Sequence, residues 1–146
     1  MKRMKQNLTL LILLMVCSLV QAQSAQKVLN IEVTGLRSDK GKVLISVFAS
    51  AKGFPEITAD AVYTTGAKIK NGKSSLVFAN ITEGNYAIAV LHDENDNMKM
   101  DTRAFGIPKE GYGFSNNVMG ILGPPSFKKA SISYPAQKEV VIKIKY

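Results

Sequence analysis

The sequence predicts an all-β protein, an antiparallel β-sandwich of about seven strands with one long, ordered Gly/Pro-rich loop. Three observations predict this fold. Apolar residues recur with a period of two rather than about 3.6. Turn signals rich in Gly, Asn and Pro separate the apolar runs at roughly 8–12-residue intervals, which is typical of sandwiches. No amphipathic stretch is long enough to predict a helix.

The first two strands show the clearest alternation. In residues 29–34, Leu, Ile and Val alternate with polar residues, and residues 43–48 repeat the pattern after a predicted turn at 35–41. Gly53 and Pro55 then interrupt the pattern within residues 50–60. Each strand is therefore expected to bury one face against a core.

A hairpin and a central strand follow. Asn71-Gly72 lies between the predicted strands 62–69 and 75–78, and both residues tolerate the positive φ that a tight hairpin turn requires. Residues 83–85 (Glu-Gly-Asn) predict another turn before the strand 86–91. The last two strands are predicted at 130–134 and 140–145, where Lys143 and Lys145 would face solvent and oppose edge pairing.

Residues 92–129 contain no predicted strand. Within 106–125, five residues are Gly and three are Pro. Loops of this length in a compact domain are usually functional or disordered. Four aromatic residues argue against disorder and indicate that something holds the loop in place, namely Phe105, Tyr112, Phe114 and Phe127.

The first 22 residues are predicted to be a secretory signal peptide. Residues 1–7 have three cations and no acid, residues 8–20 are almost wholly apolar, and Ala22 suits the cleavage position. The apolar run is shorter than the roughly 20 residues that span a bilayer, and Val16 before Cys17 does not suit a lipoprotein signal. Cleavage would leave a single domain, 23–146, without a transmembrane segment. We expect it to be periplasmic, outer-surface or secreted.

Composition excludes several kinds of site. The 146 residues include one His and one Cys, which cannot supply a Cys/His zinc site or an internal disulfide. The formal net charge is +8, and it falls to +5 from Gln23 onward because three cations precede that residue. We attribute the excess lysines to a solvated surface. Nucleic-acid binding is not expected of an exported chain without a basic stripe interleaved with aromatic residues.

The loop begins with a pattern typical of calcium sites. Oxygen-bearing side chains lie at Asp93, Asn95, Asn97 and Asp101, and the carbonyl of Lys99 lies at the intervening position, as in the first nine residues of an EF-hand loop. Met98 replaces the usual Gly, and Ala104 replaces the bidentate Glu. A further ligand would have to come from Glu110, Asn116, Asn117 or water. The alternative interpretation is an Asx-rich turn without a metal.

Three strings resemble one bacterial family. They are His92-Asp93-x-Asn95-x-Asn97, the run EGYGFSNN at 110–117, and Gly123-x-Pro125-x-Phe127. They are similar to the uncharacterised secreted family called domain of unknown function 2141, over roughly residues 28–146. The resemblance implies an exported sandwich and no established activity. Residues 81–93 are also similar to transthyretin-like and carboxypeptidase-regulatory-like domains, which are typically accessory or binding modules.

We therefore expect an exported, non-enzymatic β-sandwich module. A Ca²⁺ ion would organise its long loop, and the loop would recognise a cell-envelope polysaccharide or protein, or another carbohydrate ligand. One alternative is a small secreted hydrolase that uses His92 with Asp93 or Glu110. Another is a structural subunit of an envelope assembly. Tyr112 and Phe114 could form a recognition platform or the plug that seats the loop on the sandwich.

Overall fold

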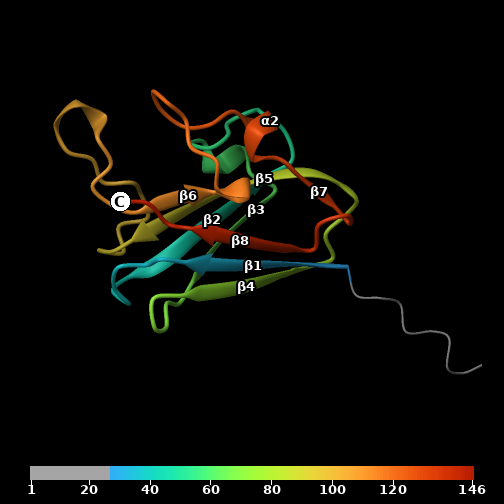
Figure 1. Ribbon diagram of the computed structural model, residues 1–146, viewed down its shortest axis with the longest axis horizontal. Coiled ribbons are helices and arrows are strands. Elements are labelled where there is room, and N and C mark those ends of the chain that lie inside the picture. Colours follow the sequence, from blue (N-terminus) through green and yellow to red (C-terminus); the bar gives the residue numbers. More distant parts are fainter. Residues whose placement is uncertain (1–26) are drawn as a thin grey trace, which may run out of the picture.

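Two β-sheets lie face to face in the computed structural model, which describes residues 27–146 (Figure 1). The predicted signal peptide at 1–22 lies outside the described residues. The eight strands are β1 (Val28–Thr34), β2 (Lys42–Phe48), β3 (Tyr63–Ala67), β4 (Ser74–Ala79), β5 (Gly84–Asp93), β6 (Tyr112–Phe114), β7 (Ile132–Tyr134) and β8 (Glu139–Lys143). The short helical segments are η2 (Thr58–Asp60), η3 (Ala104–Gly106), η4 (Ser115–Asn117) and α2 (Phe127–Ala130).

The two sheets confirm the predicted sandwich. One sheet has the order β4-β1-β8, and the other has β3-β2-β5-β6, with β7 pairing to the start of β5. All pairs are antiparallel except β1 with β8, which is parallel. The chain passes from β7 in one sheet to β8 in the other and enters that sheet in the direction of β1. A wholly antiparallel arrangement is therefore not what the chain adopts.

The alternating apolar residues fill the space between the sheets. In β1, every second residue from Leu29 to Val33 is buried, and its neighbours are only partly buried. The same alternation places one face of β2, β5 and β8 in this core. Burial of such side chains stabilises by roughly 1.5–3 kcal/mol each, so this interface supplies most of the driving force for folding.

A second, smaller apolar cluster covers the other face of β5. Ala87 and Ala130 are fully buried there beside Phe114. The ring of Phe54 lies edge-on to Phe114 and Phe127, with centroids 6.0 Å apart in each pair. Small side chains on this face of β5 let the aromatic rings approach the sheet closely. The cluster fixes the second half of the long loop against the sandwich.

The structure corrects three predicted element boundaries. The segment 92–129 contains β6 and most of α2, although we predicted no strand there. β6 has only three residues with Gly at its centre, so it is too short to show alternation, and it forms because β5 offers an unpaired edge. Residues 84 and 85 belong to β5 rather than to a turn, because they pair with β7. The strand predicted from residue 130 begins at Ile132 because α2 ends at Ala130.

The predicted turn at Asn71-Gly72 is confirmed. Both residues have positive φ, 53° and 70°, and Lys70 and Lys73 exchange backbone hydrogen bonds across them. The Asp39 carboxylate accepts hydrogen bonds from both backbone amides of the turn at 2.8 Å, and these bonds lower the Asp39 pKa. The predicted hairpin is nevertheless wrong: β3 pairs with β2 and β4 pairs with β1 in different sheets, so the turn connects the two layers of the sandwich.

Candidate functional site

The candidate site begins where the central strand β5 ends. Asp93 is the last residue of β5 and is fully buried. Its two carboxylate oxygens accept hydrogen bonds from the backbone amides of Asn97 and Met98, at 3.0 and 2.9 Å. A single buried side chain therefore closes the turn that follows the strand.

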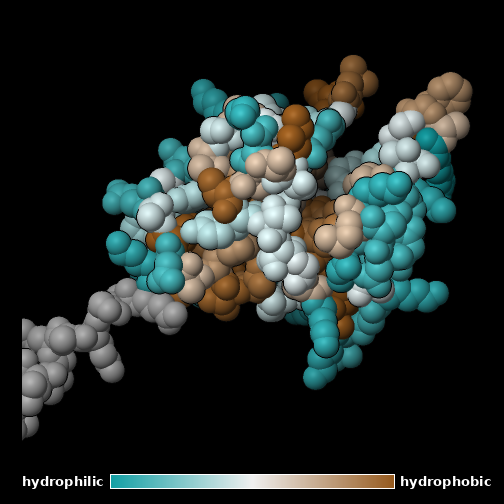
Figure 2. Space-filling view, turned by 180° about the vertical axis from the view of Figure 1, so that it is seen from behind, coloured by the Kyte–Doolittle hydropathy of each residue, from teal (hydrophilic) through white to brown (hydrophobic). Residues whose placement is uncertain are grey.

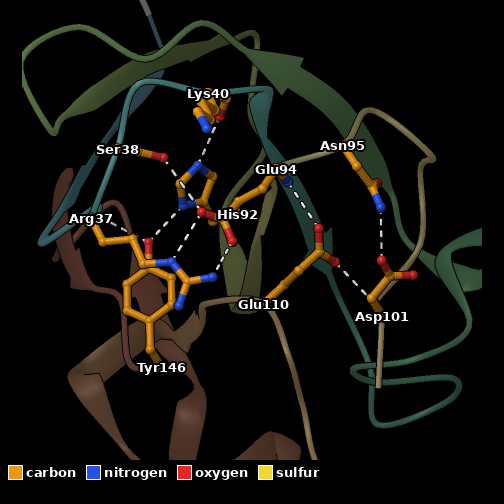
Figure 3. Close-up of polar contacts among 9 residues, drawn as sticks. All are labelled: Arg37, Ser38, Lys40, His92, Glu94, Asn95, Asp101, Glu110 and Tyr146. Carbon is orange, nitrogen blue, oxygen red and sulfur yellow. Dashed lines mark hydrogen bonds and ion pairs between the residues drawn. The ribbon is translucent and has the colours of Figure 1, made fainter. Parts of the chain in front are cut away.

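The remaining polar side chains of this turn come together. The side-chain amides of Asn95 and Asn97 donate to the two carboxylate oxygens of Asp101, at 2.7 and 2.9 Å (Figure 3 shows the Asn95 contact). Their amide oxygens accept from backbone amides two residues onward, at 3.2 and 3.0 Å. These are Asx turns, in which Asn fixes its own backbone. The predicted residues thus converge, while Asp96 turns away to pair with Lys42 at 3.1 Å.

Met98 occupies the position at which an EF-hand loop has Gly. Its φ is +67°, and that of Asp96 is +60°. Left-handed backbone is uncommon for residues other than Gly, Asn and Asp. The sharp bend of a calcium-type loop therefore forms here, although Met98 must adopt an unfavourable conformation to make it.

Glu110 joins the two ends of the turn. It is buried, and its carboxylate oxygens accept from the backbone amides of Glu94 and Asp101 at 2.9 and 3.0 Å (Figure 3). Glu110, a possible further ligand of the predicted metal site, thus holds the backbone at both ends of the turn.

His92 is fully buried and lies between two partners that are distant in sequence. Its Nε2 is 2.9 Å from the carbonyl oxygen of Lys40, and its Nδ1 is 2.6 Å from the hydroxyl of Tyr146 (Figure 3). Because a carbonyl only accepts, Nε2 bears the proton. In the neutral ring Nδ1 is then the acceptor, and it accepts from the Tyr146 hydroxyl, which itself accepts from the backbone amide of Arg37 at 3.0 Å. Both ring nitrogens are occupied, and neither contacts Asp93 or Glu110.

A charged pair covers this histidine. The Arg37 guanidinium forms a two-point ion pair with Glu94 and lies 4.4 Å from the centroid of the Tyr146 ring. The hydrogen bond from Arg37 lowers the Glu94 pKa, and the same bond raises the Arg37 pKa. Burial raises the pKa of the Tyr146 hydroxyl.

Acid should weaken this pair. Because the Glu94 pKa is lowered in the folded state, the stability it contributes is present above its ordinary value of 4.5 and is lost as the pH falls through the lowered value. We expect Arg37→Gln to lower the free energy of unfolding at neutral pH. The difference in this free energy between the variant and the wild type should become smaller as the pH falls. Urea unfolding at a series of pH values measures this. A difference that stays constant from neutral to strongly acidic pH would contradict the assignment.

The remaining predicted residues lie away from the turn. Phe114 is buried in the second apolar cluster, and Tyr112 is half-buried beside it, with ring centroids 5.9 Å apart. The exposed Asn116 donates to the carbonyls of Lys129 and Ser131. Asn117 bonds to the backbone of Val141 and Lys143. Each thus contacts the body of the sandwich rather than the turn at 93–101.

The comparison with known families bears on this region. A family model for an uncharacterised protein conserved in bacteria, DUF2141, matches residues 31–143. The chain belongs to this family. The searches of curated proteins and of solved structures returned no match. The DUF2141 match includes the turn at 93–101, Glu110 and the loop to Phe127, whereas Tyr146 lies beyond it.

The sequence did not reveal three residues of this DUF2141 chain that contact the candidate site. Arg37, Lys40 and Tyr146 contact Glu94 or His92 from more than 50 positions away. No local pattern marks them, since the contact exists only when β2, β5 and the end of the chain are brought together. Within the part of the chain that the structure describes, no helix has the length and apolar character needed to span a bilayer.

Proposed function

We propose that this protein is an exported, non-enzymatic binding module of the bacterial envelope, in which the turn at 93–101 holds a Ca²⁺ ion. The observation behind the proposal is the convergence of Asn95 and Asn97 on the carboxylate of Asp101, next to the buried carboxylate of Asp93. These residues have the spacing of a calcium loop, and the backbone makes the bend that such a loop needs.

The donors suit calcium better than other metals. Among residues 27–146, no three His, Cys, Asp or Glu side chains come together to hold a metal ion. A cation at this turn would depend on two carboxylates, two amide oxygens and backbone or water oxygens. Ca²⁺ accepts six to eight oxygen ligands in flexible geometry, whereas softer metals prefer sulfur or imidazole. The two amide NH₂ groups now donate to Asp101. An amide that turns its oxygen toward a cation there would exchange its bond to the backbone amide two residues onward for a bond to the ion.

The surroundings of the titratable groups favour binding over hydrolysis. A general base must reach the proton that it removes. His92 is buried with both nitrogens hydrogen-bonded, and the carboxylates of Asp93 and Glu110 hold backbone amides. Export follows from the signal peptide predicted at 1–22. A binding role is also what the resemblance of residues 81–93 to transthyretin-like domains, inferred from the sequence, would imply.

Calcium should stabilise the fold. We expect the chain from Gln23 to Tyr146 to unfold at a higher temperature in Ca²⁺ than in chelator. This chain contains both apolar clusters and all strands of the described residues 27–146. A ligand at about 100 times its dissociation constant adds roughly 2.7 kcal/mol to the free energy of unfolding, which moves the midpoint by several degrees. Differential scanning calorimetry measures the shift.

Two substitutions in the same turn test where the ion lies. Asp101→Asn removes a predicted ligand and should abolish the shift. Asp96→Asn removes a carboxylate that faces Lys42 rather than the other oxygens, and it should keep the shift. Equal midpoints in Ca²⁺ and chelator for the unsubstituted chain would overturn the calcium proposal.

A further inference from the structure

Two loops project apolar side chains into solvent. Phe105 at the tip of residues 101–109 is 101% exposed, and Ile121 and Leu122 at the tip of residues 118–125 are 96% and 100% exposed. Both loops stand out from the upper edge of the sandwich in Figure 1, and Figure 2 shows apolar surface on two protrusions at that edge. Large apolar side chains that contribute nothing to the core of their own chain indicate an interaction surface.

The first projection is a small, ordered hairpin. Lys109 donates its backbone amide to Asp101 at 2.9 Å, and Arg103 donates to Ile107 at 2.7 Å. Glu110 holds its base through the backbone of Asp101. Phe105 has a φ of +63°, which is costly for an aromatic residue. The hydrogen-bonded hairpin thus holds the Phe105 ring in solvent.

The second projection is fixed where it begins. The amide side chains of Asn116 and Asn117 bond there to the backbone of α2, of Ser131 and of β8. Near its tip, Gly120 approaches Gly123 so closely that a Cβ would lie 2.0 Å from the Gly123 carbonyl oxygen. The loop therefore closes on itself, and its two apolar residues are presented at the turn.

Positive charge accompanies both projections. The exposed cations are Arg103 and Lys109 on the first loop, and Lys128 and Lys129 on α2 beside the second. None of the ion pairs among the described residues involves these four cations, and the nearby carboxylates of Asp101 and Glu110 accept from amide groups instead. Apolar tips flanked by cations match the interface of an anionic bilayer, where apolar groups enter the acyl boundary and cations meet head-group phosphates.

We propose that the tips at Phe105 and at Ile121–Leu122 insert into the surface of a bilayer that contains anionic phospholipid. A protein partner requires a continuous face of about 800 Å² with well-packed contacts. Two separate narrow tips do not provide such a face, whereas each can enter a bilayer independently. This inference rests on the proposed function, because it names the partner of the same loop region, but it does not require calcium.

Vesicle sedimentation tests the proposal. The probe is vesicles of equal parts phosphatidylcholine and phosphatidylglycerol, with pure phosphatidylcholine vesicles for comparison, and the chain from Gln23 to Tyr146 avoids binding by the apolar run at 8–20. We expect binding to the anionic vesicles in chelator as well as in Ca²⁺. The triple variant F105S/I121S/L122S should lower the partition coefficient at least about tenfold. K128Q/K129Q should lower it about fivefold per cation on anionic vesicles only.

Matched variants control for general effects. V77S/V141S removes two exposed apolar side chains from the outer face of the sheet β4-β1-β8 and should leave binding unchanged. K68Q/K70Q makes the same charge change at the β3–β4 turn, which lies at the opposite edge (Figure 1), and should have little effect.

Three results would overturn the inference. The first is no sedimentation with either vesicle. The second is full binding by the triple variant. The third is binding to native envelope fragments that protease treatment abolishes, together with no binding to lipid alone, which would indicate a protein partner. Loss of the calcium-induced thermal shift with vesicle binding intact would affect only the calcium proposal.

Discussion

Gly41→Ala is expected to destabilise the protein by about 3 kcal/mol or more. Gly41 has a φ of +65°, and a Cβ at this position would lie 1.9 Å from the backbone carbonyl oxygen of Asp93. Backbone cannot move aside as a flexible side chain can. Relief of the clash would separate the start of β2 from the end of β5, where Lys42 pairs with Asp93. It would also move Lys40, whose carbonyl accepts from His92.

Gly106→Ala is the matched control for this clash. Gly106 has a similar φ of +74°, but a Cβ there meets nothing within 4 Å. Gly106→Ala should therefore lower the free energy of unfolding by only about 1 kcal/mol, the cost of left-handed backbone for Ala. Urea unfolding should separate the two variants by roughly 2 kcal/mol, and the thermal midpoint of Gly41→Ala should fall by roughly 10 °C. Equal unfolding free energies would show that the end of β5 does not approach Gly41 as described.

Asp93→Asn is expected to lower the free energy of unfolding by about 2–3 kcal/mol. The substitution keeps the size of the side chain but replaces one acceptor oxygen with an NH₂ group. Because both oxygens accept from backbone amides and the residue is fully buried, one amide, of Asn97 or Met98, would then face a donor. A buried donor without an acceptor costs more than the bond itself contributes.

Asp96→Asn shows what the same chemical change does in an exposed position. Asp96 lies three residues away, is exposed, and has a φ of +60° that Asn tolerates well. We expect a change within about 0.5 kcal/mol. Urea unfolding in chelator measures both, and hydrogen exchange should show faster exchange at the amides of Asn97 and Met98 in Asp93→Asn alone. If both variants unfold alike, Asp93 does not close the turn.

In the long loop, some features follow from local sequence pattern and others depend on tertiary contacts. The turn at residues 93–101 could be predicted from the spacing of its Asx residues, because short polar side chains bond to their own backbone. The structure brings these residues together. The bonds from Glu110 to both ends of this turn could not be predicted, because they form only when the chain returns from the projecting hairpin to β6. β6 itself exists because the edge of β5 is free, which is a property of the sheet and not of the residues Tyr112–Phe114.

His92 illustrates the same division. From the sequence alone, His92 was the one imidazole and a candidate for the hydrolase alternative, with no indication of what its ring contacts. The partners of both ring nitrogens, Lys40 and Tyr146, became visible only in the structure, since they lie more than 50 residues away in the chain.

By itself the sequence determined the all-β class, most strands and the composition of the turn, because period-two burial and Asx chemistry act over a few neighbouring residues. Only the tertiary structure decided the parallel β1–β8 pair, the partners of His92 and Glu110, and the placement of both apolar loops at one edge of the sandwich (Figure 1). Such features arise where segments distant in the chain meet, and no local pattern encodes which segments those will be.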